Sequence, residues 1–108
     1  MNDQMSSAEK GKRWTFITNH AMVFMYVAEH PDATIRQIAT DLGLGWRTVA
    51  GILHDLRKDN YVLAFRVGKG NLYRVDSTLT LRKGPYSKYT LEEFFTILRQ
   101  PPTTQPPA

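Results

Sequence analysis

The segment from residue 34 to residue 56 constrains the fold most, because it holds two short helical patterns joined by a glycine. Thr34 and Gln37 have the spacing of a capping box that starts the first helix, and Gly43 suits the left-handed residue that ends it. Two apolar stripes at helical spacing predict the buried sides of the two helices. They are Ile35, Ile38, Ala39 and Leu42, followed by Val49, Ile52, Leu53 and Leu56.

The second of these helices is expected to begin near Gly45 or Trp46 and to end at Asp59 and Asn60, where Asn tolerates a left-handed backbone. Leu44 is expected to fill the gap between the two helices. Two short helices joined by a tight turn that contains glycine predict a helix-turn-helix motif.

Segments on both sides of this motif complete a small domain. Thr18 or Asn19 caps a helix that runs to about Glu29 and is apolar almost all round, which indicates burial on several sides and suggests cover by a partner subunit. After the motif, residues 61–67 predict a strand, residues 68–71 a turn, and residues 72–75 the returning strand of a hairpin.

The C-terminal part is expected to be irregular or extended from Leu79 to Ser87. Thr90 then opens a second capping box, and a short helix runs to about Arg99. Its apolar side consists of Leu91, Phe94, Phe95 and Leu98.

These elements predict a mostly helical α+β fold, a winged helix-turn-helix with a three-helix core, a two-stranded wing and an extra C-terminal helix. We expect four parts: a flexible tail over residues 1–12, the winged domain over 13–76, an extension with possible dimerisation over 77–99, and a disordered tail over 100–108.

The composition narrows the function classes. The chain has no cysteine, which removes disulfides, thiolate-bound zinc and a thiol nucleophile and suits a reducing cytoplasm. No apolar run approaches the roughly 20 residues that cross a bilayer, and the N-terminus lacks a signal-peptide pattern. We therefore expect a soluble cytoplasmic protein without membrane contact.

The net charge of +4 is concentrated in one place. Residues 35–75 carry seven cations and three anions, whereas the rest of the chain carries seven of each. A basic segment of this kind favours a polyanionic partner, although an ordinary solvated surface would also account for it.

The run from Thr18 to Asp76 resembles the small winged-helix transcriptional regulators related to the MarR and ArsR families. Its most telling part reads TIRQIATDLGLGWRTVAGILHDLRKDNYVLAFRVGKGNLYRVD. The resemblance implies a recognition helix in the major groove of double-stranded DNA and a wing on the backbone or in the minor groove. It also implies a homodimer on near-palindromic sites.

On this resemblance, the third helix presents Arg47 for bidentate contact to guanine and Trp46 for packing on a sugar or a thymine methyl. Arg66 is expected to point outward because it alternates with Phe65 and Val67. The residues predicted to hold phosphates and not to read bases are Thr34, Arg36, Arg66, Lys69 and Arg74. The candidate DNA-binding residues are Thr34, Arg36, Trp46, Arg47, Thr48, Ala50, Gly51, His54, Arg66, Lys69 and Arg74.

Two features of the third helix leave alternatives open. Ala50 and Gly51 stand where relatives carry longer polar side chains, so we expect few direct contacts to bases, with specificity that rests on DNA shape or on the dimer. A glycine inside a helix also suggests close approach by DNA or by another helix. Trp46 would equally fit ordinary core or turn packing.

No pattern of an enzyme or a cofactor site stands out. His20, His30 and His54 lack the four-residue spacing of a helical metal site, and Glu92 with Glu93 suits a helix start better than a catalytic pair. We therefore expect neither catalysis, nor a metal, nor a cofactor.

Two other functions stay open beside DNA binding. Exposed aromatic residues at Trp14, Phe16, Phe94 and Phe95 would suit a protein-interaction module on the same scaffold. A cavity for a small apolar effector would suit a ligand-sensing regulator. Its expected lining is Met22, Phe24, Met25, Tyr26 and Phe94, which ordinary core or dimer packing would also explain.

Overall fold

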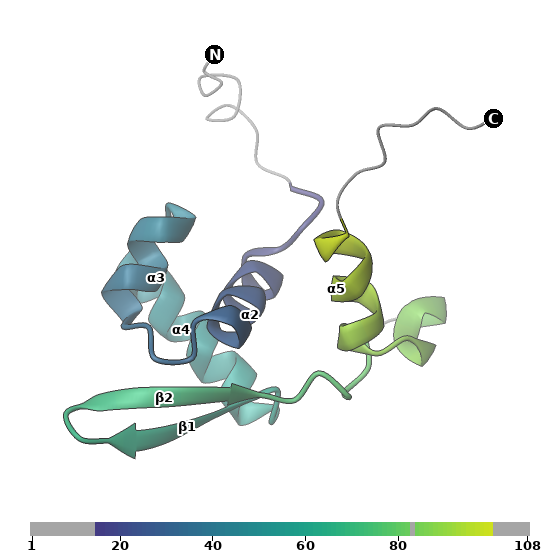
Figure 1. Cartoon of the computed structure of the whole chain (residues 1–108). Coiled ribbons are helices and arrows are strands. Elements are labelled where there is room, and N and C mark those ends of the chain that lie inside the picture. The colour runs from purple at the N-terminus through teal and green to yellow at the C-terminus, as the bar shows by residue number, and fades with distance from the viewer. Residues whose placement is uncertain (1–14, 83, 101–108) are drawn as a thin grey trace, which may run out of the picture.

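The computed structural model describes residues 15–82 and 84–100, which form four α-helices, one 3₁₀ helix and a two-stranded antiparallel sheet. With the labels of Figure 1, the elements are α2 (Asn19–Glu29), α3 (Ile35–Leu42), α4 (Trp46–Lys58), β1 (Val62–Val67), β2 (Gly70–Val75), η1 (Gly84–Lys88) and α5 (Leu91–Arg99). The expected tail over residues 1–12 and all but the first residue of the tail over 100–108 lie outside the described residues.

The helix-turn-helix forms as predicted. The Thr34 hydroxyl accepts a hydrogen bond from the backbone N–H of Gln37, whose side chain accepts one from the N–H of Thr34 in return. Gly43 ends α3 with a φ of 69°, and the N–H of Leu44 then donates to the carbonyl of Ala39 at 2.9 Å. The buried residues of α4 are Val49, Ile52, Leu53 and Leu56, as expected.

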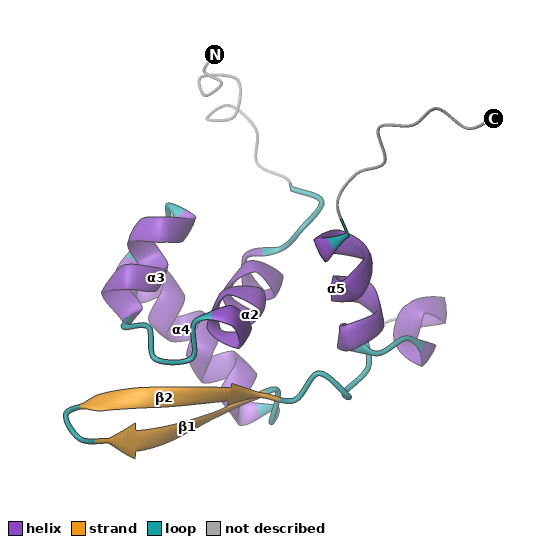
Figure 2. Cartoon of the chain, in the orientation of Figure 1, coloured by secondary structure: helices purple, strands orange, loops and turns teal. Residues whose placement is uncertain are grey.

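The hairpin lies along one side of the helices (Figure 2) and joins their core through Val62 and Tyr73, which are buried. Its turn is tighter than the four residues predicted, because Val67 pairs directly with Gly70. Gly68 has a φ of 59° and Lys69 does not have a positive φ, the pattern of a type II′ turn. The N–H of Tyr73 also donates to the carbonyl of Pro31 at 2.7 Å, which fastens the hairpin to the loop after α2.

The faces of the hairpin differ from the prediction. Arg66 shares its face of the hairpin with Val62 and Ala64, which pack toward the core. It is nevertheless exposed, because it lies near the turn. The residues that point away from the helices are Phe65 and Val67, which are 46% and 59% exposed. The expectation that they face inward was wrong, because β1 is apolar on both faces and alternation alone does not say which face is buried.

The C-terminal extension covers the side of α2 away from α3 (Figure 1). Thr90 and Glu93 form the predicted capping box of α5, and the ring of Phe95 stacks on Phe24 with centroids 5.4 Å apart. Much of the cover expected from a partner subunit is therefore supplied by the same chain. Phe95 is 2% exposed, so its expected role as an exposed aromatic was wrong.

The connection before α5 is more regular than expected. Thr80 and Thr90 form an isolated antiparallel bridge, and the 3₁₀ helix η1 lies between them. The hydroxyl of Tyr61 donates to the carbonyl of Thr80 at 3.1 Å, which ties this connection to the start of the hairpin. The mostly helical winged helix-turn-helix with an extra C-terminal helix is thereby confirmed.

Candidate nucleic-acid interface

Helix α4 divides its residues between two environments. One side fills the core, and the opposite side lies at the surface of the described chain. Ala50 is half-buried on that surface side, and the other members are exposed. The exposed members between Trp46 and Asp55 are Trp46, Arg47, Thr48, Gly51, His54 and the acidic Asp55. The structure therefore brings the candidate residues of the third helix together on one face.

Trp46 and Arg47 form a stacked pair at the start of this face. The Arg47 guanidinium carbon lies 5.2 Å from the centroid of the Trp46 ring, which is cation–π geometry. Trp46 is 55% exposed, so ordinary core packing does not account for it. Stacking limits the directions in which the Arg47 guanidinium can point, and it leaves the N–H groups at the guanidinium edge available to a ligand.

Gly51 lies in open space. A Cβ built at this position would meet no atom within 4 Å, apart from the chain neighbours and the helix's own backbone. The expectation that another helix approaches Gly51 finds no partner in the described part of the chain. The helix itself gains nothing from a glycine here, because alanine is favoured over glycine inside a helix.

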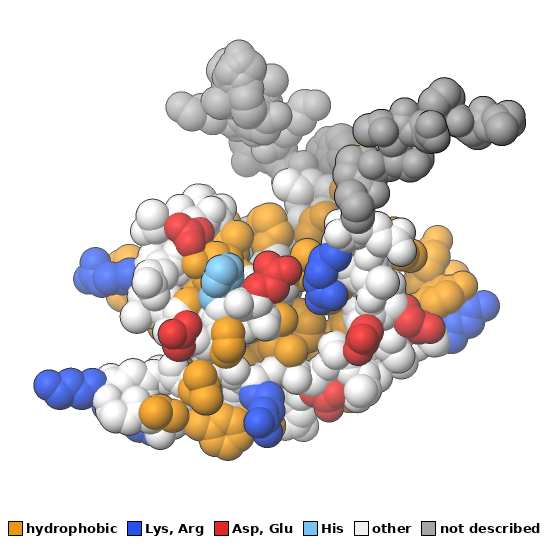
Figure 3. Space-filling view, viewed as in Figure 1, with side chains coloured by type: hydrophobic (Ala, Val, Ile, Leu, Met, Phe, Trp, Pro, Cys, Tyr) orange, Lys and Arg blue, Asp and Glu red, His pale blue; other side chains and the backbone are white. Residues whose placement is uncertain are grey.

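The other candidates lie on α3 and on the hairpin. Arg36, Arg66, Lys69 and Arg74 are exposed, and within residues 15–82 and 84–100 none of them has a carboxylate within 4.0 Å. The Thr34 hydroxyl already accepts the capping hydrogen bond, but its own proton stays available to donate. Figure 3 shows Lys or Arg side chains at the tip of the hairpin and farther along it.

Arg57 and Lys58 were not among the predicted site residues. They lie in the last turn of α4, and both are exposed. Their signal in the sequence was ambiguous, because cations in the last turn also stabilise the helix dipole.

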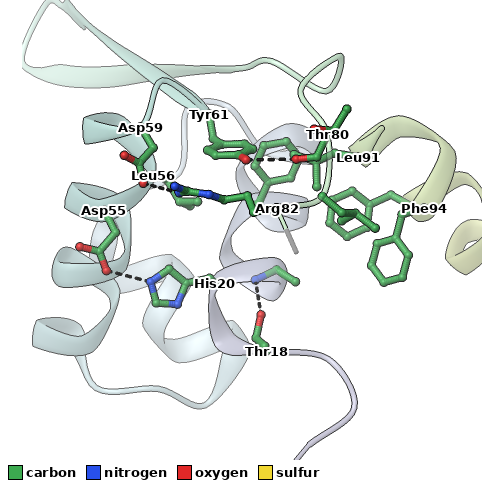
Figure 4. A pocket seen from close by; sticks show the side chains of 14 residues that line it. Thr18, His20, Asp55, Leu56, Asp59, Tyr61, Thr80, Arg82, Leu91 and Phe94 are labelled. Atoms are coloured by element: carbon green, nitrogen blue, oxygen red, sulfur yellow. Dashed lines mark hydrogen bonds and ion pairs between the residues drawn. The ribbon is translucent and has the colours of Figure 1, made fainter. Parts of the chain in front are cut away.

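A cavity of about 400 Å³ lies between α2, the C-terminal half of α4 and the extension (Figure 4). Its apolar wall includes Phe24, Phe94 and Phe95. Of the residues predicted to line an effector cavity, Phe24 and Phe94 do so, whereas Met22, Met25 and Tyr26 lie outside its lining.

One hydrogen-bonded pair and one ion pair lie at the rim of this cavity. His20 Nε2 lies 2.9 Å from Asp55 Oδ2, and Arg82 Nη1 lies 2.6 Å from Asp59 Oδ2. Figure 4 shows the Arg82 side chain reaching toward Asp59. The hydrogen bond from His20 lowers the pKa of Asp55, and the hydrogen bond to Asp59 raises the pKa of Arg82. The two pairs link α4 and its C-cap residue to other parts of the chain.

Among the described residues, no group of three or more His, Asp or Glu side chains lies close enough to hold a metal ion. Among the same residues, no helix is long and apolar enough to cross a membrane.

Comparison with known proteins adds one structural likeness. The chain is similar to FabT of Streptococcus pneumoniae, solved in complex with DNA, with 21% sequence identity and a TM-score of 0.48. The match covers 69% of this chain and 57% of that chain. No family model matches the chain, and no curated protein matches it in sequence. The relation to the MarR and ArsR families therefore stays a prediction, and the functional argument rests on α4 and the hairpin.

Proposed function

We propose that this chain is a transcriptional regulator that binds double-stranded DNA, with α4 in the major groove and the hairpin on the backbone or in the minor groove. The observation that carries the proposal is the solvent-facing side of α4, which the described chain leaves uncovered from Trp46 to His54. An α-helix about 10–12 Å in diameter fits a major groove about 12 Å wide.

Cations without carboxylate partners supply the affinity in this proposal. Arg36 on α3 and the hairpin residues Arg66, Lys69 and Arg74 are free of ion pairs among the described residues. Each phosphate that a cation neutralises releases condensed counterions, so the affinity falls steeply as salt is raised. The Thr34 hydroxyl adds a neutral donor for a phosphate at the start of α3.

Arg47 is proposed as the principal base-reading residue. Trp46 holds its guanidinium from one side, and a guanidinium so oriented can donate two hydrogen bonds to a guanine. Ala50 and Gly51 reach no base edge by hydrogen bonding, so they bring the helix close to the groove floor instead. We therefore propose that much of the specificity comes from DNA shape.

A homodimer is also part of the proposal. The extension presents apolar side chains that the described part of the chain does not cover, and these would suit a second copy. They are Tyr86, Tyr89, Ile97 and Leu98, of which Ile97 is 68% exposed. Two copies would place their α4 helices on successive major grooves, about 34 Å apart.

Selection of bound fragments from random duplex DNA, followed by titration at several salt concentrations, tests the proposal. Arg47→Ala is expected to weaken binding to the selected site by about 5- to 150-fold, the equivalent of about 1–3 kcal/mol for one bidentate contact. Lys69→Ala is expected to weaken binding to all duplexes alike, and to reduce the slope of log affinity against log salt concentration by about 1. Lys88→Ala, which removes an exposed cation from η1, is the matched control. The absence of measurable duplex binding at low salt would refute the proposal.

The cavity favours a second, compatible function as a ligand-sensing regulator. Its volume of about 400 Å³ lies in the range of small-molecule sites, and its rim charges are already paired, which favours an uncharged apolar ligand. A thermal-shift screen with small apolar compounds is expected to give a rise in Tm that grows with concentration. A flat response across such a screen would count against this function.

A further inference from the structure

The face of the hairpin that points away from the helices is apolar. Leu63, Phe65, Val67 and Leu72, here called the outer strip, are between 40% and 59% exposed. The strand register places Phe65 directly opposite Leu72, so the outer strip is continuous across the two strands. Figure 3 shows hydrophobic side chains along the hairpin.

The solvent face of a two-stranded antiparallel hairpin is ordinarily polar, because only one face is needed for the core. Here the core face is already supplied by Val62, Ala64 and Tyr73. Four large side chains left about half exposed amount to an apolar patch on the order of 300 Å², taking about 150–250 Å² for a whole large side chain. A contiguous patch of this size with a polar border is typical of an interaction site.

The outer strip has a basic hollow at its β1 side. A hollow of about 450 Å³ is lined by Leu63 together with His54, Arg57 and Lys58 from the end of α4. No carboxylate of the described chain lines it, and neither Arg57 nor Lys58 has an ion pair among the described residues. An apolar side chain and two free cations therefore share one concave surface.

A second hollow borders the outer strip at its β2 side. It has a volume of about 610 Å³, and Phe65 and Leu72 line it beside Arg74 and the C-terminal end of α2. Arg74 is exposed, and the lining contains no acidic residue of the described chain. The whole hairpin from residue 62 to residue 75 contains three cations and no anion.

From this arrangement we propose that the outer strip and its two basic hollows dock an acidic amphipathic segment of another protein. Apolar side chains of the segment would lie on Phe65 and Leu72, and its carboxylates would meet Arg74 on one side and Arg57 with Lys58 on the other. Apolar contact would supply the affinity, and charge complementarity would supply the selection of the partner. The proposal does not depend on DNA binding.

Two other occupants fit the surface less well. A second copy in a symmetric dimer would place the cations of one hairpin against the other hairpin, which has no carboxylate to pair with them. Duplex DNA presents phosphates, which the cations can hold, but it has no apolar surface that would match Phe65 and Leu72. Of the three occupants, a protein segment therefore fits the outer strip best.

Selection from a displayed library of random 16-residue peptides, with the whole chain as target, tests the proposal. The enriched peptides are expected to combine net negative charge with apolar residues. Phe65→Ser is expected to weaken binding of the best peptide at least 10-fold, whereas Thr96→Ala, a change at an exposed residue of α5, should leave its Kd unchanged. Arg74→Glu should weaken binding of acidic peptides and strengthen binding of versions with Lys in place of Glu, with Lys88→Glu on η1 as the control for charge.

Several outcomes would overturn the proposal. The first is that no peptide is enriched, and the second is that the enriched peptides bind the Phe65→Ser chain equally well. The third is that the chain binds vesicles of phosphatidylserine and phosphatidylcholine more tightly than any peptide, and that Phe65→Ser abolishes this vesicle binding. Loss of an oligomer in Phe65→Ser on sedimentation would identify the outer strip as a self-interface. The same variant should keep its affinity for duplex DNA within about threefold, and a loss parallel to that of the peptide would assign the outer strip to DNA.

Discussion

Gly51→Ala should make the protein more stable. Gly51 lies inside α4 and is exposed, and a Cβ added there meets no atom within 4 Å beyond its own neighbours and helix backbone. The substitution therefore neither creates a clash nor fills a void, so its effect reduces to helix propensity. Alanine is favoured over glycine in a helix by about 0.8–1.0 kcal/mol, and the unfolded chain with alanine has less conformational entropy to lose. In a domain of this size, about 1 kcal/mol raises Tm by about 4–8 °C.

The measurement is chemical and thermal unfolding of the whole chain, with Gly68→Ala as the matched control. Gly68 also has no atom within 4 Å of the added Cβ, but its φ is 59°, so alanine there should lower the free energy of unfolding by about 1–2 kcal/mol. A gain in the free energy of unfolding at Gly51 and a loss at Gly68 would show the effect of backbone conformation alone, because an added Cβ has equal room at both positions. An unchanged or lower Tm for Gly51→Ala would refute the reasoning and would mean that something covers Gly51 in solution.

Duplex binding by the same variant tests why a glycine is present. If DNA approaches α4 closely at Gly51, alanine should raise Tm and weaken DNA binding together, as is common where a functional site is destabilised. Equal affinity in the two proteins would show that Gly51 has no part in the interface, and the proposed readout would then rest on Arg47.

Three further predictions concern the core, the turn and the charges. Phe95→Ala should cost about 3–5 kcal/mol of unfolding free energy because the ring is buried against Phe24, and it should speed amide exchange throughout α5. Gly43→Ala should cost about 1–2 kcal/mol in denaturant unfolding, because its φ of 69° is unfavourable for alanine. The pKa of Asp55 is lowered by its hydrogen bond with His20, so this carboxylate stabilises the folded chain above its ordinary pKa of 3.8. The stability difference between the natural chain and Asp55→Asn should therefore shrink as acid is added below that pH, and a constant difference would contradict the assignment.

The helical part of the fold was predictable because several local signals agree at the same residues. Thr34 and Gln37 start α3, Gly43 ends it, and each signal has a direct physical cause in capping or in backbone conformation. The position of α5 was not predictable in the same way. Its apolar side could be recognised, but only tertiary packing shows that Phe95 lies against Phe24 in the same chain and not against a partner subunit.

The candidate interface was predictable as a set of residues but not as a geometry. The exposed side of α4 follows from the helical period once the buried stripe is known. The stacking of Arg47 on Trp46 and the empty space at Gly51 depend on side-chain positions that no periodicity gives. The ion pairs of Asp55 and Asp59 join segments that are 35 and 23 residues apart, and a single sequence carries no signal for such pairs.

The hairpin shows most clearly where reasoning from sequence ends. Successive residues of β1 from Val62 to Phe65 are all apolar, so the two-residue period that normally identifies the buried face is missing, and either face could have been the inner one. A hairpin that is apolar on both faces is also an aggregation hazard, since β1 is an edge strand. The cations Arg66, Lys69 and Arg74 oppose that hazard, because two such hairpins repel each other, while an acidic partner is attracted by the same charges. The charge that keeps copies of this chain apart is thus the charge that would select the partner of the outer strip.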